Sequence, residues 1–167
     1  MTGTAPAPAH LRRARSSDAT AIRRMIDGLI ADSGSPPANP ATPAELARHL
    51  SGPQPDIEGV IAEREGEAVG MVLYFPWLST WHGRLNLYIQ DLYVVPGDRG
   101  SGLGRRLLAA AAREGKARGC KGLLLAVEVS NTQAAQFYAR LGFECLEGER
   151  HWLLAPARFE ALMEEGI

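Results

Sequence analysis

The sequence contains few cysteines, and they are not spaced as metal ligands. Cys120 and Cys145 are the two cysteines among its 167 residues. They form neither the disulfide framework that staples small secreted domains nor a Cys/His pattern typical of a zinc site. We therefore expect no metal cofactor and a reduced, cytoplasmic location.

An excess of positive charge and a long apolar run are also missing. The formal net charge is -1 and the sequence pI is about 6.4, so no basic field attracts nucleic acid or an anionic membrane. No run approaches the ~18 apolar residues that span a bilayer, and the first nine residues lack the features of a secretory signal. The sequence predicts neither a nucleic-acid partner nor a membrane partner.

The remaining composition is that of one globular domain. Hydrophobic residues make up 46% of the chain and charged residues 22%, and a chain of this length buries roughly two-thirds of its unfolded surface. The Pro/Ala-rich residues 1–9 are expected to be disordered. Residues 10–167 are expected to form a single domain.

The hydrophobic pattern alternates between strands and helices, which predicts a mixed α/β fold. The expected strands are 10–15, 57–65, 67–75, 85–95, 122–129 (buried on both faces), 143–146 and 151–154. One helix is expected after the N-cap cluster 16–18, and a second from a cap near Thr42 to Leu50. A third is expected to end at Gly119, and two more are expected at 132–142 and 156–165. Residues 33–43 and 78–84 are expected to be connections. The helix before Gly119 has an apolar stripe of Leu103, Leu107, Leu108, Ala111 and Gly115.

The strand at 85–95 carries a carboxylate in an apolar pattern. Alternation places Leu87, Ile89, Asp91 and Tyr93 on one face and Tyr88, Gln90, Leu92 and Val94 on the other. A carboxylate with such neighbours needs a hydrogen-bond partner or has a shifted pKa. For the nearby rings of Trp77, Trp81 and Tyr88 we expect core and hairpin packing, with a substrate pocket as the alternative.

A glycine-rich turn, PGDRGSGLG, joins this strand to the next helix. Such turns let backbone N–H groups approach a phosphate at a helix N-terminus. A dinucleotide fingerprint is excluded because Arg105 or Leu107 stands where its third glycine is needed. A Walker A motif is excluded because Leu103-Gly104 replaces Lys-[Ser/Thr]. The pattern R-G-x-G-x-G over Arg99–Gly104 therefore predicts another kind of phosphate-binding turn.

This turn resembles the acetyl-CoA pyrophosphate loop of the GNAT superfamily of N-acetyltransferases. The resemblance covers Trp81–Trp152 and, more loosely, the whole chain. It continues through Leu125-x-Val127-x-x-x-Asn131, Ala134, Phe137-Tyr138 and Leu141-Gly142-Phe143. The strings Trp81-His-Gly83-Arg84, Leu87-Tyr88 and Asp91-Leu-Tyr-Val are most similar to the diamine (spermidine/spermine) N-acetyltransferase branch.

The resemblance implies a central, mostly antiparallel mixed sheet of about six to seven strands flanked by helices. It also implies acetyl-CoA as co-substrate, a small-molecule amine as acceptor and a homodimer. Gly97-Asp98 departs from the family, which usually has a larger residue before the arginine. The residues that it assigns to acetyl-CoA binding are Leu92, Tyr93, Val94, Arg99, Gly100, Ser101, Gly102, Leu103, Gly104, Arg105, Asn131, Ala134 and Tyr138.

The resemblance further implies direct acetyl transfer. Backbone N–H groups of Asp91–Val94 would polarise the thioester carbonyl, and Tyr138 would protonate the departing thiolate. The general base stays open because Gln90 stands where the diamine branch usually has a glutamate. Asp91, Glu128 and a water relayed by Gln90 are the candidates.

The acceptor is predicted to be a small amine that is amino-acid-like or polyamine-like. Gln90 is neutral and Arg150 stands where the diamine branch has an acid, so an amine that also bears a carboxylate fits better than a polycation. The substrate-binding candidates are Trp81, Gln90, Asp91, Arg150 and Trp152. A non-catalytic acyl-CoA-binding module and a protein or peptide N-acetyltransferase are the alternatives.

Overall fold

The computed structural model describes residues 7–34, 41–146 and 154. Its strands are β1 (His10–Arg13), β2 (Glu58–Arg64), β3 (Glu67–Ser79), β4 (Arg84–Val94) and β5 (Leu123–Leu125). Its helices are α1 (Ala19–Ser33), α2 (Pro43–His49), α3 (Leu103–Ala117) and α4 (Thr132–Arg140), with short 3-10 helices at Ser16–Asp18 and Pro96–Asp98. The chain divides into two compact units, Met1–Thr132 and Gln133–Ile167, and each is described by itself.

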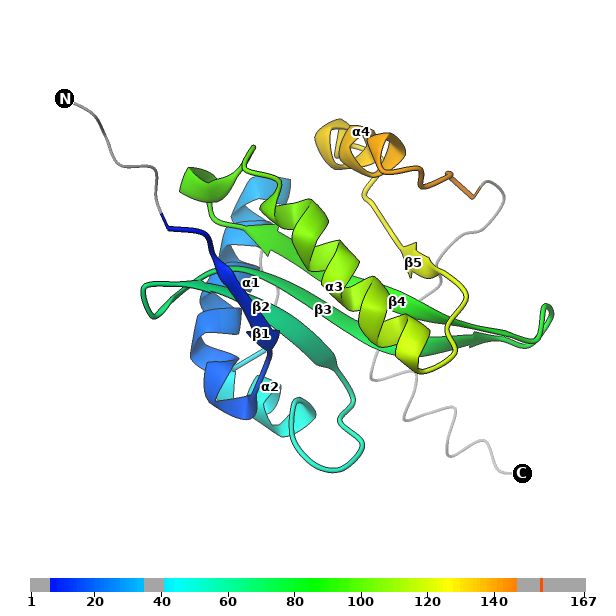
Figure 1. Cartoon of the computed structure of the whole chain (residues 1–167), viewed down its shortest axis with the longest axis horizontal. Coiled ribbons are helices and arrows are strands. Elements are labelled where there is room, and N and C mark those ends of the chain that lie inside the picture. The colour runs from blue at the N-terminus through cyan, green and yellow to red at the C-terminus, as the bar shows by residue number, and fades with distance from the viewer. Residues whose placement is uncertain (1–6, 35–40, 147–153, 155–167) are drawn as a thin grey trace. The chain divides into compact units, whose positions relative to one another are not determined.

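The first unit is built on a mixed sheet with strand order β1-β2-β3-β4-β5 (Figure 1). The first four strands pair antiparallel, and β5 pairs parallel to β4 after the crossover through α3. The sheet confirms the predicted α/β class, with five strands in the described part of the chain instead of six to seven. Within those same residues, no helix is both long and apolar enough to cross a bilayer.

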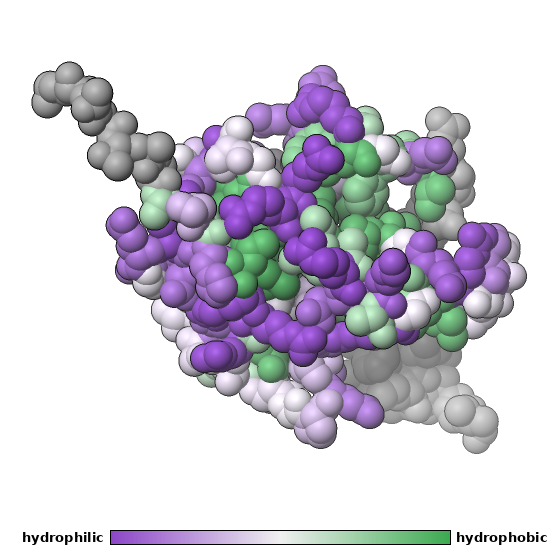
Figure 2. Space-filling view, in the orientation of Figure 1, coloured by the Kyte–Doolittle hydropathy of each residue, from purple (hydrophilic) through white to green (hydrophobic). Residues whose placement is uncertain are grey.

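Helices cover both faces of this sheet (Figure 1). The apolar stripe predicted for α3 is buried along its whole length on one face. On the other face, Ile22 and Met25 of α1 pack with Ile61, Met71, Leu73 and Tyr93 of the strands. The outward side of α3 is mostly hydrophilic (Figure 2). Burial of the two apolar helix faces against the sheet is the main stabilising term in this layered arrangement.

Local capping fixes where α1 ends and where α2 begins. Helix α1 ends at Gly34, whose φ of 71° is left-handed and suits a glycine. Helix α2 begins at the predicted cap: the Thr42 side chain accepts from the Glu45 amide, and the Glu45 carboxylate accepts from the Thr42 amide. The proline at its first position needs no amide donor there.

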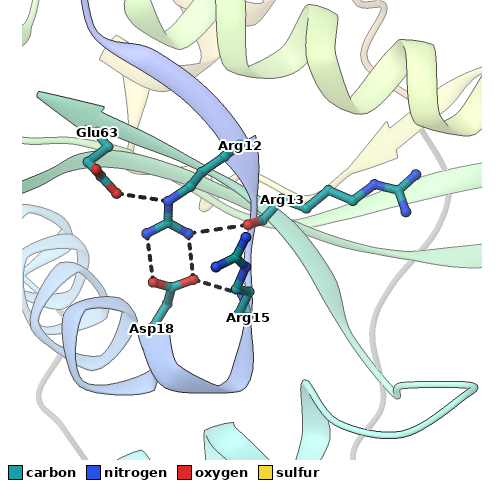
Figure 3. A network of polar contacts seen from close by, with 5 residues as sticks. All are labelled: Arg12, Arg13, Arg15, Asp18 and Glu63. Carbon is teal, nitrogen blue, oxygen red and sulfur yellow. Dashed lines mark hydrogen bonds and ion pairs between the residues drawn. The ribbon is translucent and has the colours of Figure 1, made fainter. Parts of the chain in front are cut away.

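A polar network holds the N-terminal strand to the sheet (Figure 3). Arg12 of β1 donates from Nε to Glu63 of β2 and from Nη1 and Nη2 to Asp18, each at 2.8 Å. The Arg12 guanidinium therefore holds the pKa of the Asp18 carboxyl below its usual value. Since Asp18 immediately precedes α1, the network links β1, β2 and the start of that helix.

Three expected elements differ from the structure. Strand β3 runs to Ser79, so part of the expected 78–84 connection belongs to a longer hairpin. Strand β5 has three half-buried residues, whereas a strand over 122–129 buried on both faces was expected. In the described chain, β5 is an edge strand that pairs only with β4. Residues 143–146 form no strand, and the elements expected at 151–154 and 156–165 lie outside the described residues, except Leu154, which is in no strand.

Candidate functional site

The centre of β4 contains a β-bulge at Gln90. On β3, Leu73 pairs with Asp91, whereas the next residue, Tyr74, pairs with Ile89. Gln90 therefore has no partner on β3, and its side chain is exposed. A bulge adds one residue to one strand, so the side chains on its two sides no longer follow one alternation.

Because of the bulge, the two halves of β4 bury opposite faces. Leu87 lies against α3, where a Cβ added to Gly115 would be 3.5 Å from the Leu87 Cβ. Tyr93 lies against α1 instead, and a Cβ added to Gly28 would be 2.3 Å from the Tyr93 hydroxyl. The prediction that Leu87, Ile89, Asp91 and Tyr93 share one face is therefore wrong, because it assumed an unbroken strand.

The bulge also reverses the direction of the backbone hydrogen bonds. Before it, the Leu87 amide donates toward the β5 side, to the Gly122 carbonyl at 3.0 Å. After it, the Val95 amide donates toward the β3 side, to the Val69 carbonyl at 3.1 Å. Since the direction alternates along an antiparallel ladder, Leu92 and Val94 direct their amides away from β3.

These two amides face an edge that β5 does not cover. Strand β5 pairs with β4 only from Leu87 to Ile89. In the part of the chain that the structure describes, the residues Gln90–Val94 therefore have no strand partner on the side away from β3. We call them the open edge of β4. An extended ligand can accept hydrogen bonds from the amides of such an edge.

Asp91 is the carboxylate of the open edge. It is half-buried on the same face as its pairing partner Leu73, which belongs to the apolar core under α1. Burial raises the pKa of Asp91 to about 6, because an apolar environment disfavours the charged form. Of the two outcomes expected for this carboxylate, a hydrogen-bond partner or a shifted pKa, the raised pKa is the one observed.

The glycine-rich turn leads from the open edge to the N-terminus of α3. Gly100 and Gly102 have φ values of 76° and 81°, a conformation that residues with a Cβ rarely adopt. Gly102 is the N-cap, its carbonyl accepts from the Arg106 amide at 3.1 Å, and no side chain caps this end in the described residues. The amides of Leu103–Arg105 thus remain available to an anion, which the helix dipole also favours.

Asp98, which departs from the family pattern, anchors this turn through two polar contacts. Its buried carboxylate forms an ion pair with the Arg64 guanidinium at 2.5 Å. Its carbonyl accepts from the Ser101 hydroxyl at 2.6 Å. Asp98 is therefore a structural residue that fixes the turn to the end of β2, and its charge is paired with Arg64.

The side chain of Arg99, which belongs to the turn, extends to α1. Its Nε donates to the Val94 carbonyl at 2.9 Å, and its guanidinium forms an ion pair with Asp32 at 2.5 Å. The same guanidinium lies 5.4 Å from the centre of the Tyr93 ring, within cation–π range. The Arg99 side chain is thus engaged by α1 and β4, while Arg105 is exposed at the start of α3.

Other predicted site residues follow β5. In the first unit, the Asn131 amide donates to the Glu128 carbonyl at 2.8 Å, and Glu128 is exposed. Ala134 and Tyr138 belong to the second unit, where the Tyr138 ring meets Phe137 and Phe143 edge-on at 5.1 and 5.4 Å. Helix α4 ends at Arg140, two residues before the predicted end, and Gly142, predicted to cap it, has a left-handed φ of 90°.

Of the remaining substrate candidates, the structure describes Trp81. Trp81 lies in the turn between β3 and β4 and is 95% exposed, so the packing expected for it is not observed. The reason is that β3 and β4 extend beyond β2, whose pairing with β3 ends at Tyr74. Arg150 and Trp152 lie outside the described residues. No group of three or more metal-ligating side chains occurs in the described part of the chain.

Sequence reasoning missed one ring on the Asp91 face. Phe75 of β3 lies opposite Tyr88 of β4, and the two rings stack with centroids 5.0 Å apart. The hairpin prediction contained the signal, since pairing the two strands would have placed these residues together. The missing information was that β3 continues to Ser79, which sets the register that pairs Phe75 with Tyr88.

Comparisons with known proteins agree with this geometry. Residues 25–143 match the acetyltransferase (GNAT) family. The chain is 32% identical over 166 residues to the thialysine N-epsilon-acetyltransferase of Mus musculus, with 95% of this chain and 97% of that protein covered. It is 27% identical over 161 residues to the spermidine/spermine N(1)-acetyltransferase-like protein 1 of Homo sapiens, covering 92% of this chain and 23% of that protein.

The fold likewise matches solved structures. An integron cassette protein from the mobile metagenome of V. cholerae has a TM-score of 0.75 at 18% identity, with 95% of this chain and 99% of that chain covered. At this level of identity the likeness shows the fold alone.

Proposed function

Because the chain belongs to the acetyltransferase (GNAT) family, we propose that it transfers the acetyl group of acetyl-CoA directly to the primary amine of a small, amino-acid-like molecule. The observation that carries the proposal is that the open edge of β4, which contains Asp91, leads along the chain to the N-terminus of α3. No side chain of the described residues caps this N-terminus. One stretch of chain thus offers amides for an extended ligand, amides for an anion, and a carboxylate.

The donor side follows from the backbone. The amides of Leu103–Arg105, with Gly100 and Gly102 shaping the turn, would hold the pyrophosphate of acetyl-CoA. Along the open edge, the amides of Leu92 and Val94 would hold the pantetheine arm and polarise the thioester carbonyl. Acetyl-CoA supplies the activated acetyl group, and Asn131, Ala134 and Arg105 are proposed as further contacts.

On the acceptor side, we assign Asp91 as the general base. A carboxylate with a pKa of about 6 is ionised at neutral pH and is a stronger base than an ordinary aspartate. The amine nitrogen bonds to the acetyl carbon as the carbon–sulfur bond breaks, its proton passes to Asp91 directly or through water, and Tyr138 protonates the thiolate. Gln90, exposed on the bulge, has no basic group, and Glu128 is more exposed than Asp91.

The acceptor class rests on two observations. The position where the diamine branch has a glutamate holds the neutral Gln90, which weakens the attraction for a polycation. One relative that matches nearly the whole chain at 32% identity is named a thialysine N-epsilon-acetyltransferase, and thialysine is a lysine analogue. We therefore propose a lysine-like acceptor, with Arg150 as the partner of its carboxylate.

The test is a screen of thiol release from acetyl-CoA against thialysine, lysine, other amino acids, spermidine and short peptides. Fastest turnover with thialysine or lysine would support the proposal, and fastest turnover with spermidine would overturn the acceptor class. Preferred peptide turnover would favour a protein or peptide N-acetyltransferase. Thermal stabilisation by CoA without thiol release for any amine would instead favour a non-catalytic acyl-CoA-binding module.

We further propose a cytoplasmic homodimer, as the family resemblance implies. The support in the molecule is the exposure of Trp81 and Trp77 on the β3–β4 hairpin, 95% and 40%, since exposed large apolar side chains are common at subunit interfaces. Light scattering coupled to gel filtration at micromolar concentration measures the mass directly. A monomer mass of 18.0 kDa would overturn this proposal.

A further inference from the structure

The stacked pair of Phe75 and Tyr88 is the least explained feature near Asp91. The two residues face each other across the β3–β4 ladder, with an angle of 26° between their ring planes. Both are half-buried, and neither belongs to the apolar core that Leu73 and Tyr93 form with α1. Packing within the described fold therefore leaves part of each ring surface uncovered.

The register places this pair on the same face as Asp91. Phe75 lies two residues from Leu73 on β3, and Leu73 pairs with Asp91. Two residues along a strand span about 7 Å and return to the same face. Without the bulge at Gln90, Tyr88 and Asp91 would lie on opposite faces of β4. The bulge therefore brings two aromatic rings and a carboxylate together.

Rings next to a carboxylate suit an alkyl amine. The methylene groups of such a ligand pack against aromatic faces, and its ammonium group is attracted both by a carboxylate and by the negative face of a ring. An anionic or strongly polar group would be disfavoured in the same place. The charge of Asp91 and the apolar rings thus specify one kind of occupant: a linear, cationic arm.

We propose that Phe75 and Tyr88 form the subsite that holds the methylene arm of the acceptor and presents its amine to Asp91. This inference rests on the proposed function and extends it to specificity. The two rings determine how strongly the enzyme prefers acceptors with a long methylene arm. Each additional methylene that reaches the rings is expected to lower the acceptor KM about fourfold.

The test compares variants on the two faces of the hairpin. Tyr88→Leu and Phe75→Leu should each raise the acceptor KM about tenfold, leave the acetyl-CoA KM within twofold, and flatten the dependence on methylene number. Tyr88→Phe keeps the ring and should retain that dependence. Leu78→Ala is the matched control, because Leu78 is 58% exposed and lies on the opposite face of the same strand. Thermal unfolding of each variant checks its fold.

Direct binding separates this inference from the proposed function. Calorimetry with CoA-loaded protein and lysine, thialysine or shorter amines needs no turnover. Weaker binding to Tyr88→Leu than to Leu78→Ala supports the subsite even if the wild-type protein releases no thiol, which would overturn only the proposed function. Equal affinities for the two variants, or no amine binding to the wild-type protein, would overturn the subsite itself.

Discussion

The two halves of β4 differ in what surrounds them, although they belong to one strand. The half before Gln90 pairs with β3 and β5 and packs Leu87 against α3. The half after Gln90 has its open edge, packs Tyr93 against α1 and carries Asp91 with a raised pKa. One extra residue thus separates a structural half from a half that we propose to be catalytic. The following predictions test this division.

Deletion of Gln90 should have the largest effect. Without the extra residue, one half of β4 must turn its buried side chains to the wrong face, which exposes either Leu87 or Tyr93. We expect a loss of roughly 3–5 kcal/mol of stability, comparable to large core substitutions, measured by urea unfolding. Gln90→Ala keeps the residue count at an exposed position and should unfold within ~0.5 kcal/mol of the wild type. Equal stability of the deletion variant would show that the bulge is not required.

Asp91→Asn should abolish most of the activity while leaving the protein folded. The amide is nearly isosteric but accepts no proton, so kcat should fall by about 10² to 10⁴. In the wild-type enzyme, kcat/KM should rise with pH as Asp91 ionises, through a pKa near 6. Steady-state rates between about pH 5 and 8.5 measure both effects. Wild-type turnover by the Asp91→Asn variant would rule out Asp91 as the general base and leave Glu128 or a water molecule held by Gln90 as the candidates.

The same substitution should stabilise the fold at neutral pH. The folded pKa of Asp91 is raised from 3.8 to about 6, so the unfolded state binds fewer protons, and ionised Asp91 destabilises the protein above pH 6. A shift of about two units corresponds to at most about 3 kcal/mol. Asp91→Asn should therefore gain stability at pH 8, and the gain should shrink as pH falls through 6 and disappear below about 4. Unfolding midpoints at several pH values follow this difference, and a gain that grows on acidification would contradict the assignment.

The glycine turn depends on backbone conformation rather than on space. A Cβ added to Gly102 or to Gly97 would meet nothing within 4 Å, but only Gly102 has a positive φ. Gly102→Ala should therefore cost about 1–2 kcal/mol in the bound geometry and raise the Kd for CoA about tenfold. Gly97→Ala is the matched control and should bind CoA normally. Calorimetric titration with CoA distinguishes the two, and equal affinities would place the phosphate contact elsewhere.

These cases show what the sequence does and does not encode locally. The turn at Arg99–Gly104, the α3 stripe and the Thr42 cap were predicted because residue type and spacing specify them within one segment. The bulge was missed because Gln90 is neither glycine nor proline, and its extra position is visible only when β4 is aligned with β3. The faces of Asp91 and Phe75 depend on that alignment, so they required the tertiary structure.

The smallest effect is expected at Asp32, where the second half of β4 meets α1. Its carboxylate holds the Arg99 guanidinium, but both side chains are about half exposed, 46% and 43%, so the pair is weak and screened by salt. Asp32→Asn removes a negative charge close to the proposed pyrophosphate site and frees Arg99, which keeps its contacts with Val94 and Tyr93. The acetyl-CoA KM should fall about two- to threefold at low salt and less at about 0.5 M salt. Asp27→Asn, on the same helix but paired with Arg23, should change it less. A higher KM for Asp32→Asn would instead mean that the ion pair positions the turn and that Arg99 acts without touching the phosphate.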